Sequence, residues 1–148
     1  MLLRPLGVAA ALVVTCTACA EQQEASYADL AAADRAGAIQ RGWIPDWLPK
    51  SARGLREVHN LDTNQSVLAF RYDPSGQLTV PNNCSQVLPS EVAPIPFAMS
   101  WWPSDVPPSK GGAHRHAFFM CGRAHAFLAV SATEGEAYSE GEAYYWRP

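Results

Sequence analysis

Apolar and polar residues alternate most clearly along residues 65–72, Gln-Ser-Val-Leu-Ala-Phe-Arg-Tyr. Every second side chain of an extended chain points to the same side, so the large residues from Leu68 to Tyr72 share one face. Residues 54–61 precede this run, and the connecting Asp62-Thr63-Asn64 has side chains that favour a turn by bonding to local backbone. The pattern predicts two strands joined as a β-hairpin.

The C-terminal part of the chain contains further strand patterns. Apolar residues dominate 117–121 and 124–130, and Gly122-Arg123 separates the two runs. Glycine followed by any second residue is typical of a type II′ hairpin turn. Residues 143–146 read Ala-Tyr-Tyr-Trp, which favours one more strand because aromatic residues are enriched in sheets.

A helical pattern precedes the first hairpin. Ser26 and Asp29 have the S-x-x-D spacing of a capping box, in which a hydroxyl and a carboxylate bond to free backbone N–H groups. Ala-rich sequence follows with apolar residues near helical spacing, and Gly42 suits the position just after a helix end. These features predict an N-terminal helix over about residues 27–41.

Residues 73–113 change character, because eight of the twelve prolines lie between 74 and 108. Proline lacks a backbone N–H and restricts its neighbour, so regular structure is not expected there except for a short strand near 97–102. We interpret 74–113 as a long Pro-rich loop, and loops of this length are either functional or poorly ordered.

Together these elements predict an α+β fold. We expect residues 27–148 to form a single domain in which the N-terminal helix packs on an antiparallel sheet of about five strands.

Residues 42–52, GWIPDWLPKSA, place Trp43 and Trp47 beside Pro45 and Pro49. The prolines prevent the helix from continuing and stiffen the path, while the aromatic surfaces are costly to leave in water. We predict a rigid corner whose aromatic rings fill the gap between helix and sheet. The alternative is an exposed aromatic patch that binds a partner or a saccharide.

A second aromatic–proline cluster, Trp101-Trp102-Pro103, lies inside the Pro-rich loop. Packing is the preferred interpretation, because the loop needs contacts to hold it on the domain. The alternative treats Trp101 and Trp102 as a candidate binding surface.

The N-terminal residues have the layout of an export signal. Arg4 gives a positive start, the apolar run Leu6–Val14 has no charge, and small residues follow before the polar Glu21. That run is too short to span a bilayer, which needs about 20 residues. We expect residues 1–18 to be a signal peptide and expect no transmembrane helix.

The small residues before Cys19 resemble the lipobox of bacterial lipoproteins, although Cys16 stands where Leu or Val is usual. Cleavage before Cys19 would expose a cysteine for lipidation by palmitate and related chains, with residues 19–26 as a polar tether. Neither Ala20 nor Glu21 is the Asp that resembles an inner-membrane retention signal, so we expect anchoring to a Gram-negative outer membrane, facing the periplasm. The alternative is ordinary cleavage before Glu21, which gives a soluble periplasmic or secreted protein.

Charge and cysteine content limit the classes of function. After residue 18 the chain has ten basic and fourteen acidic residues, with no basic cluster, so we expect no nucleic-acid partner. Beyond Cys19, only Cys84 and Cys121 remain, and an exported pair most often forms a disulfide. It would close a loop of about 38 residues, worth roughly 4 kcal/mol in the chain-entropy model. The alternative is two buried free thiols.

His114, His116, Cys121 and His125 include side chains of the types that bind zinc. No Cys-x-x-Cys or His-x₃-His spacing accompanies them, and Cys121 is assigned to the disulfide. We interpret these His as scattered surface residues and predict neither a metal site nor another cofactor.

Glu57, His59 and Asp62 form the only compact set of acid and base side chains. On a strand, residues 57 and 59 point to one side, where a base with an orienting carboxylate is conceivable. No serine or cysteine in a G-x-S-x-G setting accompanies them. We therefore predict hydrogen bonds that fix the hairpin, and no catalytic residue.

The stretch 41–72 resembles a group of small uncharacterised bacterial exported proteins and lipoproteins with a GWxPxxLPxSA…ExHxxDTN pattern. The resemblance implies an exported protein and no particular reaction. The matching residues are Gly42, Trp43, Pro45, Leu48, Pro49, Ser51, Ala52, Glu57, His59, Asp62, Thr63 and Asn64.

These observations lead to one functional hypothesis and one alternative. We expect a non-enzymatic cell-envelope lipoprotein, held to the membrane through Cys19, that binds a protein or cell-wall partner. The alternative is a small periplasmic hydrolase or metal-binding protein that uses Glu57 and His59.

Overall fold

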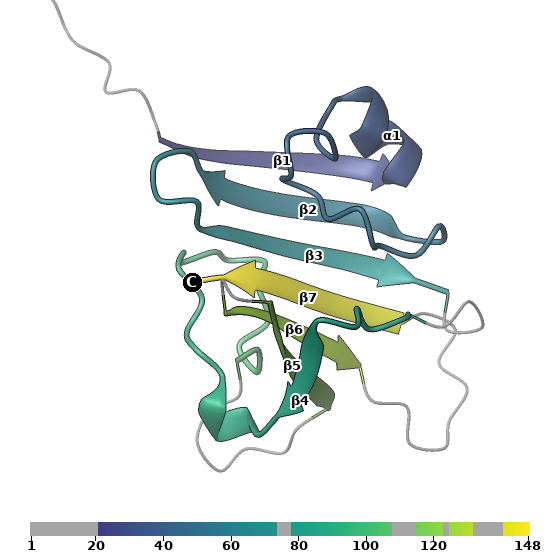
Figure 1. The fold of residues 1–148 in the computed structure, drawn as a ribbon. Coiled ribbons are helices and arrows are strands. Elements are labelled where there is room, and N and C mark those ends of the chain that lie inside the picture. Colours follow the sequence, from purple (N-terminus) through teal and green to yellow (C-terminus); the bar gives the residue numbers. More distant parts are fainter. Residues whose placement is uncertain (1–20, 74–77, 108–114, 123–124, 132–140) are drawn as a thin grey trace, which may run out of the picture.

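The computed structural model describes residues 21–73, 78–107, 115–122, 125–131 and 141–148. These residues form one twisted, seven-stranded sheet with a short α-helix and a 3₁₀ turn (Figure 1). The elements in chain order are β1 (Gln22–Asp29), α1 (Leu30–Arg35), β2 (Arg53–Asn60), β3 (Ser66–Tyr72), β4 (Cys84–Val87), η2 (Pro89–Glu91), β5 (His116–Cys121), β6 (Ala126–Ser131) and β7 (Gly141–Arg147).

The strand order across the sheet is β1-β2-β3-β7-β6-β5-β4, and all neighbouring strands are antiparallel. Strands β1 to β3 run from one edge to the middle, and β4 to β7 run from the opposite edge back to the middle (Figure 1). The two meanders join where β7 pairs with β3. The end of the chain therefore lies beside the first hairpin.

The predicted α+β fold class is wrong, because the structure is a seven-stranded antiparallel sheet with an α-helix of only six residues. Residues 22–29, assigned to the tether and the predicted helix, instead pair with β2 from Gln22↔Asn60 to Asp29↔Arg53. A short isolated helix is marginal in water, whereas this polar segment gains backbone hydrogen bonds along the open edge of β2. Its exposed, polar side chains suit an edge strand that must avoid pairing with other molecules.

The start and end of α1 explain why the predicted helix is so short. Asp29, not Ser26, caps it, and the Asp29 carboxylate accepts a hydrogen bond from the Ala32 N–H at 2.8 Å. Gly37 ends it in the left-handed conformation (φ 73°), with backbone bonds back into the last turn. Gly42, predicted at the end of the long helix, has the same φ of 73° and ends the following turn.

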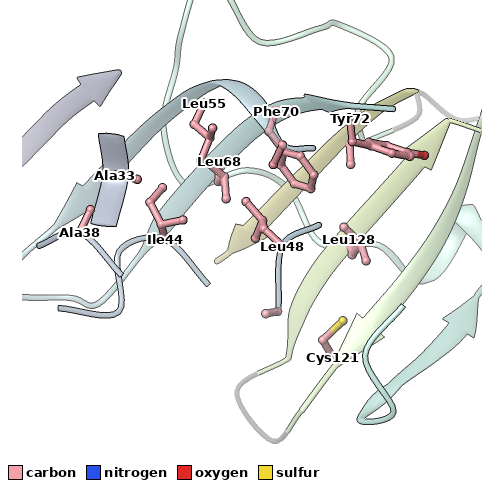
Figure 2. Packing of buried hydrophobic residues seen from close by; sticks show 13 residues of the cluster. Ala33, Ala38, Ile44, Leu48, Leu55, Leu68, Phe70, Tyr72, Cys121 and Leu128 are labelled. Atoms are coloured by element: carbon pink, nitrogen blue, oxygen red, sulfur yellow. The ribbon is translucent and has the colours of Figure 1, made fainter. Parts of the chain in front are cut away.

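Residues 36–52, here called the covering segment, cross one face of the sheet after α1 (Figure 1). Ile44 and Leu48 are buried, and both point from this segment toward the strands (Figure 2). Trp43 and Trp47 are half-buried and pack against the same core cluster. The Trp–Pro corner thus packs on the domain as predicted, but it lies mainly against the strands of the sheet and not between a helix and the sheet.

Residues 92–106 of the Pro-rich segment cover the opposite face of the sheet. Trp102 is buried there, with its ring edge against Tyr144 and Trp146 at centroid distances of 5.3 and 6.0 Å. The Trp146 indole N–H donates a hydrogen bond to the Ala93 carbonyl at 3.1 Å. The strand predicted near 97–102 is absent from this described segment, because these residues contact the face of the sheet instead of pairing along its edge.

The disulfide between Cys84 and Cys121 is confirmed. The two residues are partners in the register of β4 and β5, with Cα atoms 3.9 Å apart. The bond therefore ties the edge strand of the second meander to its neighbour. Both hairpins predicted from apolar patterns are also present, although residues 122–125, rather than two residues, connect β5 to β6.

No helix among the described residues has the length and hydrophobicity needed to cross a bilayer.

Replacing both Cys84 and Cys121 with Ala should lower the free energy of unfolding by about 4 kcal/mol, because the unfolded chain regains the freedom of a long loop. Urea denaturation of the oxidised protein and of the double variant measures this difference. Ser85→Ala, at an exposed position on the same strand, should leave stability within about 0.5 kcal/mol of the wild type. Equal stability of the oxidised protein and the double variant would contradict the assignment.

Candidate functional site

The most unusual polar group in the described sheet is a buried pair of side chains on β2. Glu57 is 0% exposed and His59 is 4% exposed, and the Glu57 Oε2 atom lies 2.8 Å from His59 Nδ1. The two-residue period of the strand places both on the face beneath the covering segment. A pair of ionisable side chains at this depth is rare unless its members bond to one another, as these two do.

A stack of three side chains covers this pair on the side of the covering segment. The Trp43 ring lies over the His59 ring, with centroids 4.0 Å apart and planes inclined by 22°. The Arg41 guanidinium lies over the Trp43 ring, 4.0 Å from the ring centroid. Gly42 allows the sharp turn that brings both residues over the strand. Trp43 and His59 both belong to the sequence pattern over residues 41–72, but no local pattern predicts their contact.

Three buried polar atoms near this stack have no hydrogen-bond partner among the described residues: Glu57 Oε1, His59 Nε2 and Arg147 Nε. Leaving such a group unsatisfied costs about 1–3 kcal/mol. This concentration of unmet hydrogen-bonding capacity is typical of places where a structure gives up stability for another purpose.

Burial raises the pKa of Glu57 above its ordinary value, because the carboxylate loses water around its charge. The hydrogen bond and charge of His59, together with the charge of Arg41, act in the opposite direction. Burial also raises the pKa of Tyr27 on β1, and the negative charge of Glu57 adds to that shift. The Glu57 carboxyl therefore takes up a proton more readily than an exposed glutamate.

A small pocket of about 90 Å³ opens beside the pair at the end of the sheet. We call it the end pocket. Register pairing places Ser66 opposite His59, and Arg147 opposite Ser66, so three neighbouring strands contribute to it. Its lining residues are Arg41, Gly42, Trp43, His59, Asn60, Leu61, Asn64, Gln65, Ser66 and Arg147.

Sequence reasoning missed Arg147 as a site residue. It is the last residue of β7, and its Nη1 donates to the Asn64 side-chain oxygen at 2.9 Å. No local pattern predicts its place beside His59, because that proximity depends on the pairing of β7 with β3.

Asp62, the third member of the predicted acid–base set, is not brought to the pair. It lies in the exposed turn between β2 and β3, where the Asn60 carboxamide oxygen accepts hydrogen bonds from the N–H groups of Asp62 and Thr63 at 2.9 and 3.0 Å. Asn64 completes the turn in a left-handed conformation (φ 60°). Asn60, which the sequence analysis did not single out, therefore organises this turn.

A second hollow lies on the opposite face of the sheet, beside the other aromatic cluster. We call it the Trp101 groove, and it has a volume of about 190 Å³. Of the predicted pair, Trp102 is buried in the core and Trp101 is half-buried at the groove. The groove is lined by Gly54, Arg56, Ala69, Phe70, Arg71, Trp101, Glu142 and Tyr144.

Polar contacts fix the walls of the Trp101 groove. The Arg56 guanidinium lies 4.6 Å from the Trp101 ring centroid and 2.9 Å from the Glu24 carboxylate on β1. The Tyr144 hydroxyl donates to Glu142 at 3.1 Å. Burial and the nearby Glu142 charge raise the pKa of Tyr144, so its hydroxyl stays protonated. The groove thus combines an aromatic surface with a cation, a carboxylate and a hydroxyl.

The histidines considered as metal ligands do not come together in the described part of the chain. His116 lies on β5 against Tyr144, and burial lowers its pKa, whereas His125 is exposed in the β5–β6 turn. Cys121 is in the disulfide, and His114 lies outside the described residues. No group of three His, Cys, Asp or Glu side chains with metal-binding geometry occurs within 21–73, 78–107, 115–122, 125–131 and 141–148. The predicted signal peptide and Cys19 also lie outside the described residues.

Residues 21–71, about a third of the chain, match the family model described as the YbbD head domain. The matched part includes β1, α1, the covering segment, β2 and nearly all of β3. No curated protein and no solved structure matches the chain. The likeness to this family therefore includes the buried pair and its cover but not Arg147.

Glu57→Gln should change how stability depends on pH. The folded protein holds the Glu57 proton more tightly than the unfolded chain does, because burial raises the pKa of Glu57 above its ordinary value of 4.5. The stability that this proton contributes is therefore fully present below pH 4.5 and is lost as the pH rises through the raised pKa of the folded protein. We expect wild-type protein to lose unfolding free energy between pH 4.5 and neutral pH relative to Glu57→Gln. Urea denaturation across that range measures it, with the exposed Glu21→Gln as control. Parallel pH profiles for wild type and Glu57→Gln would refute the assignment.

Proposed function

We propose that this protein is an exported, non-enzymatic module of the cell envelope that binds a cell-wall glycan in the Trp101 groove. The single observation that supports it best is the composition of that groove. The half-buried Trp101 indole lines the groove and offers apolar surface for a sugar ring, while Arg56, Glu142 and Tyr144 supply donors and acceptors for hydroxyls. The fixed positions of these side chains reduce the entropy cost of binding.

Export and lipid anchoring through Cys19 form part of this proposal. Their support is the N-terminal sequence, with its apolar run and the small residues before Cys19. The Cys84–Cys121 disulfide adds independent support, because such bonds persist in oxidising compartments outside the cytosol.

We further propose that the GWxPxxLPxSA…ExHxxDTN pattern is characteristic of the family matched over residues 21–71. The support is physical. Gly42 makes a turn within the covering segment, Trp43 lies on His59, and the turn after β2 is built from the DTN residues and Asn60. Pattern positions thus lie where this fold needs them.

The alternative, a small hydrolase or metal-binding protein using Glu57 and His59, has weaker support. Trp43 covers the His59 ring, and His59 Nε2 has no hydrogen-bond partner among the described residues. A general base must reach the proton that it removes, directly or through one water. Ser66 lies opposite His59 in the register, but no hydrogen bond joins the two side chains.

Trp101→Ala should weaken binding to purified cell-wall sacculi about tenfold, because a lost aromatic contact is worth about 1–1.5 kcal/mol. A sedimentation assay with increasing amounts of sacculi measures the dissociation constant. Leu88→Ala removes an exposed apolar side chain elsewhere on the same loop and should bind like the wild type. Unchanged binding by a folded Trp101→Ala variant would exclude the Trp101 groove as the binding site. Binding to wall-associated protein but not to isolated glycan would show that the partner is a protein and not a glycan.

Cys19→Ala should abolish incorporation of labelled palmitate and move the protein from the membrane fraction to the soluble fraction. Cys16→Ala, the other cysteine of the predicted signal region, should keep both the label and the membrane association. Wild-type protein that carries no label and begins at Glu21 would support ordinary signal-peptide cleavage instead.

A further inference from the structure

We propose that the end pocket binds a single oxyanion group, either a carboxylate or a phosphate, through Arg41, His59 and Arg147. This site lies beneath the covering segment, on the face of the sheet opposite the Trp101 groove. The proposal is therefore independent of the function proposed for that groove.

The charge of the lining selects the class of ligand. Arg41 and Arg147 both carry positive charge, and none of the residues that line the pocket is an aspartate or glutamate. Glu57 does not line the pocket and is bonded to His59 Nδ1. An oxyanion fits this pocket better than a cation or an apolar group does, because guanidinium groups match the geometry of carboxylate and phosphate oxygens.

Unmet hydrogen-bonding capacity supports the same assignment. His59 is 4% exposed, and its Nε2 atom has no partner among the described residues. Arg147 donates from Nη1 to Asn64, while its buried Nε also lacks a partner there. These two side chains reach the same pocket from β2 and β7, on either side of β3. An oxyanion with two or three oxygens can accept hydrogen bonds from both.

Arg41 forms the wall on the side of the covering segment. Its guanidinium is held over Trp43 at 4.0 Å and donates to the Ala36 carbonyl at 2.6 Å. A guanidinium has five N–H groups in a fixed plane, so one such bond fixes its direction and leaves capacity for a ligand. The Arg41–Trp43–His59 stack thus positions two of the three proposed ligand-binding side chains together.

Oxyanion binding should be coupled to a proton on the acid–base pair. His59 Nε2 donates a hydrogen bond only when it bears a proton, and the contact between Glu57 and His59 Nδ1 already holds the first proton of the pair. Binding therefore favours a second proton. Other charged or titratable groups near the pair are Tyr27 and Glu24 on β1, and Arg41 and Arg147 at the pocket. We expect affinity to increase as pH falls.

The test is calorimetric titration of the purified full chain with inorganic phosphate and, separately, with acetate. Saturable binding of either supports the proposal, and the stronger of the two identifies the preferred group. Arg147→Gln should weaken binding at least tenfold, and Arg41→Gln should weaken it measurably. Arg35→Gln, at an exposed position on α1, is the matched control and should bind like the wild type.

A pH series separates a ligand-binding role of His59 from a structural one. Wild-type affinity should increase about tenfold per pH unit over the range where one proton is taken up on binding. In His59→Gln this dependence should disappear while weaker binding remains. If Arg147→Gln does not fold, Arg41→Gln decides the outcome, because it changes a surface side chain of the covering segment. Absence of saturable binding by both anions, or binding that neither arginine variant weakens, would overturn the proposal.

Discussion

The pairing of β3 with β7 is the interaction on which the rest of this structure depends. Seven residue pairs, from Ser66↔Arg147 to Tyr72↔Gly141, join two meanders that would otherwise be separate small sheets. The pairing removes one open edge from each meander and extends both apolar faces across the joined sheet. The joined sheet presents two broad apolar faces, and an irregular segment covers each of them. The two covers are the covering segment on one face and residues 92–106 on the other. The same ladder brings Arg147 to the pocket beside His59.

The two covers solve the same physical problem in similar ways. A seven-stranded sheet with little helix must bury both faces, and here irregular chain does so with tryptophan and proline. Proline restricts the unfolded chain, which lowers the entropy cost of holding an irregular path. Tryptophan buries a large area and bonds through its N–H, as Trp146 does to Ala93 and Trp102 does to Val106. On each face a half-buried indole, Trp43 or Trp101, lies beside a hollow lined by polar groups.

Burial of the Glu57–His59 pair has a cost that packing alone does not explain. A hydrophobic pair of similar volume would fill the same space without unsatisfied atoms, and replacing buried ion pairs in that way is often neutral or stabilising. The atoms of Glu57, His59 and Arg147 that lack a hydrogen-bond partner lie at one end of the sheet, where Arg41 adds a second guanidinium group. That end of the sheet is therefore the place where the described residues carry the most buried polar atoms without a hydrogen-bond partner.

The sequence alone determined the features that depend on neighbouring residues or on cysteine number. Alternation fixed the β2–β3 hairpin, and the two cysteines remaining after Cys19 fixed the disulfide. The tertiary structure decided that residues 22–29 form a strand, because the open edge of β2 outweighs weak helix preference. It also decided that Arg147 meets His59, since pairing between distant strands leaves no local pattern. Periodicity shows which face a residue occupies, whereas the neighbour on that face depends on long-range strand order.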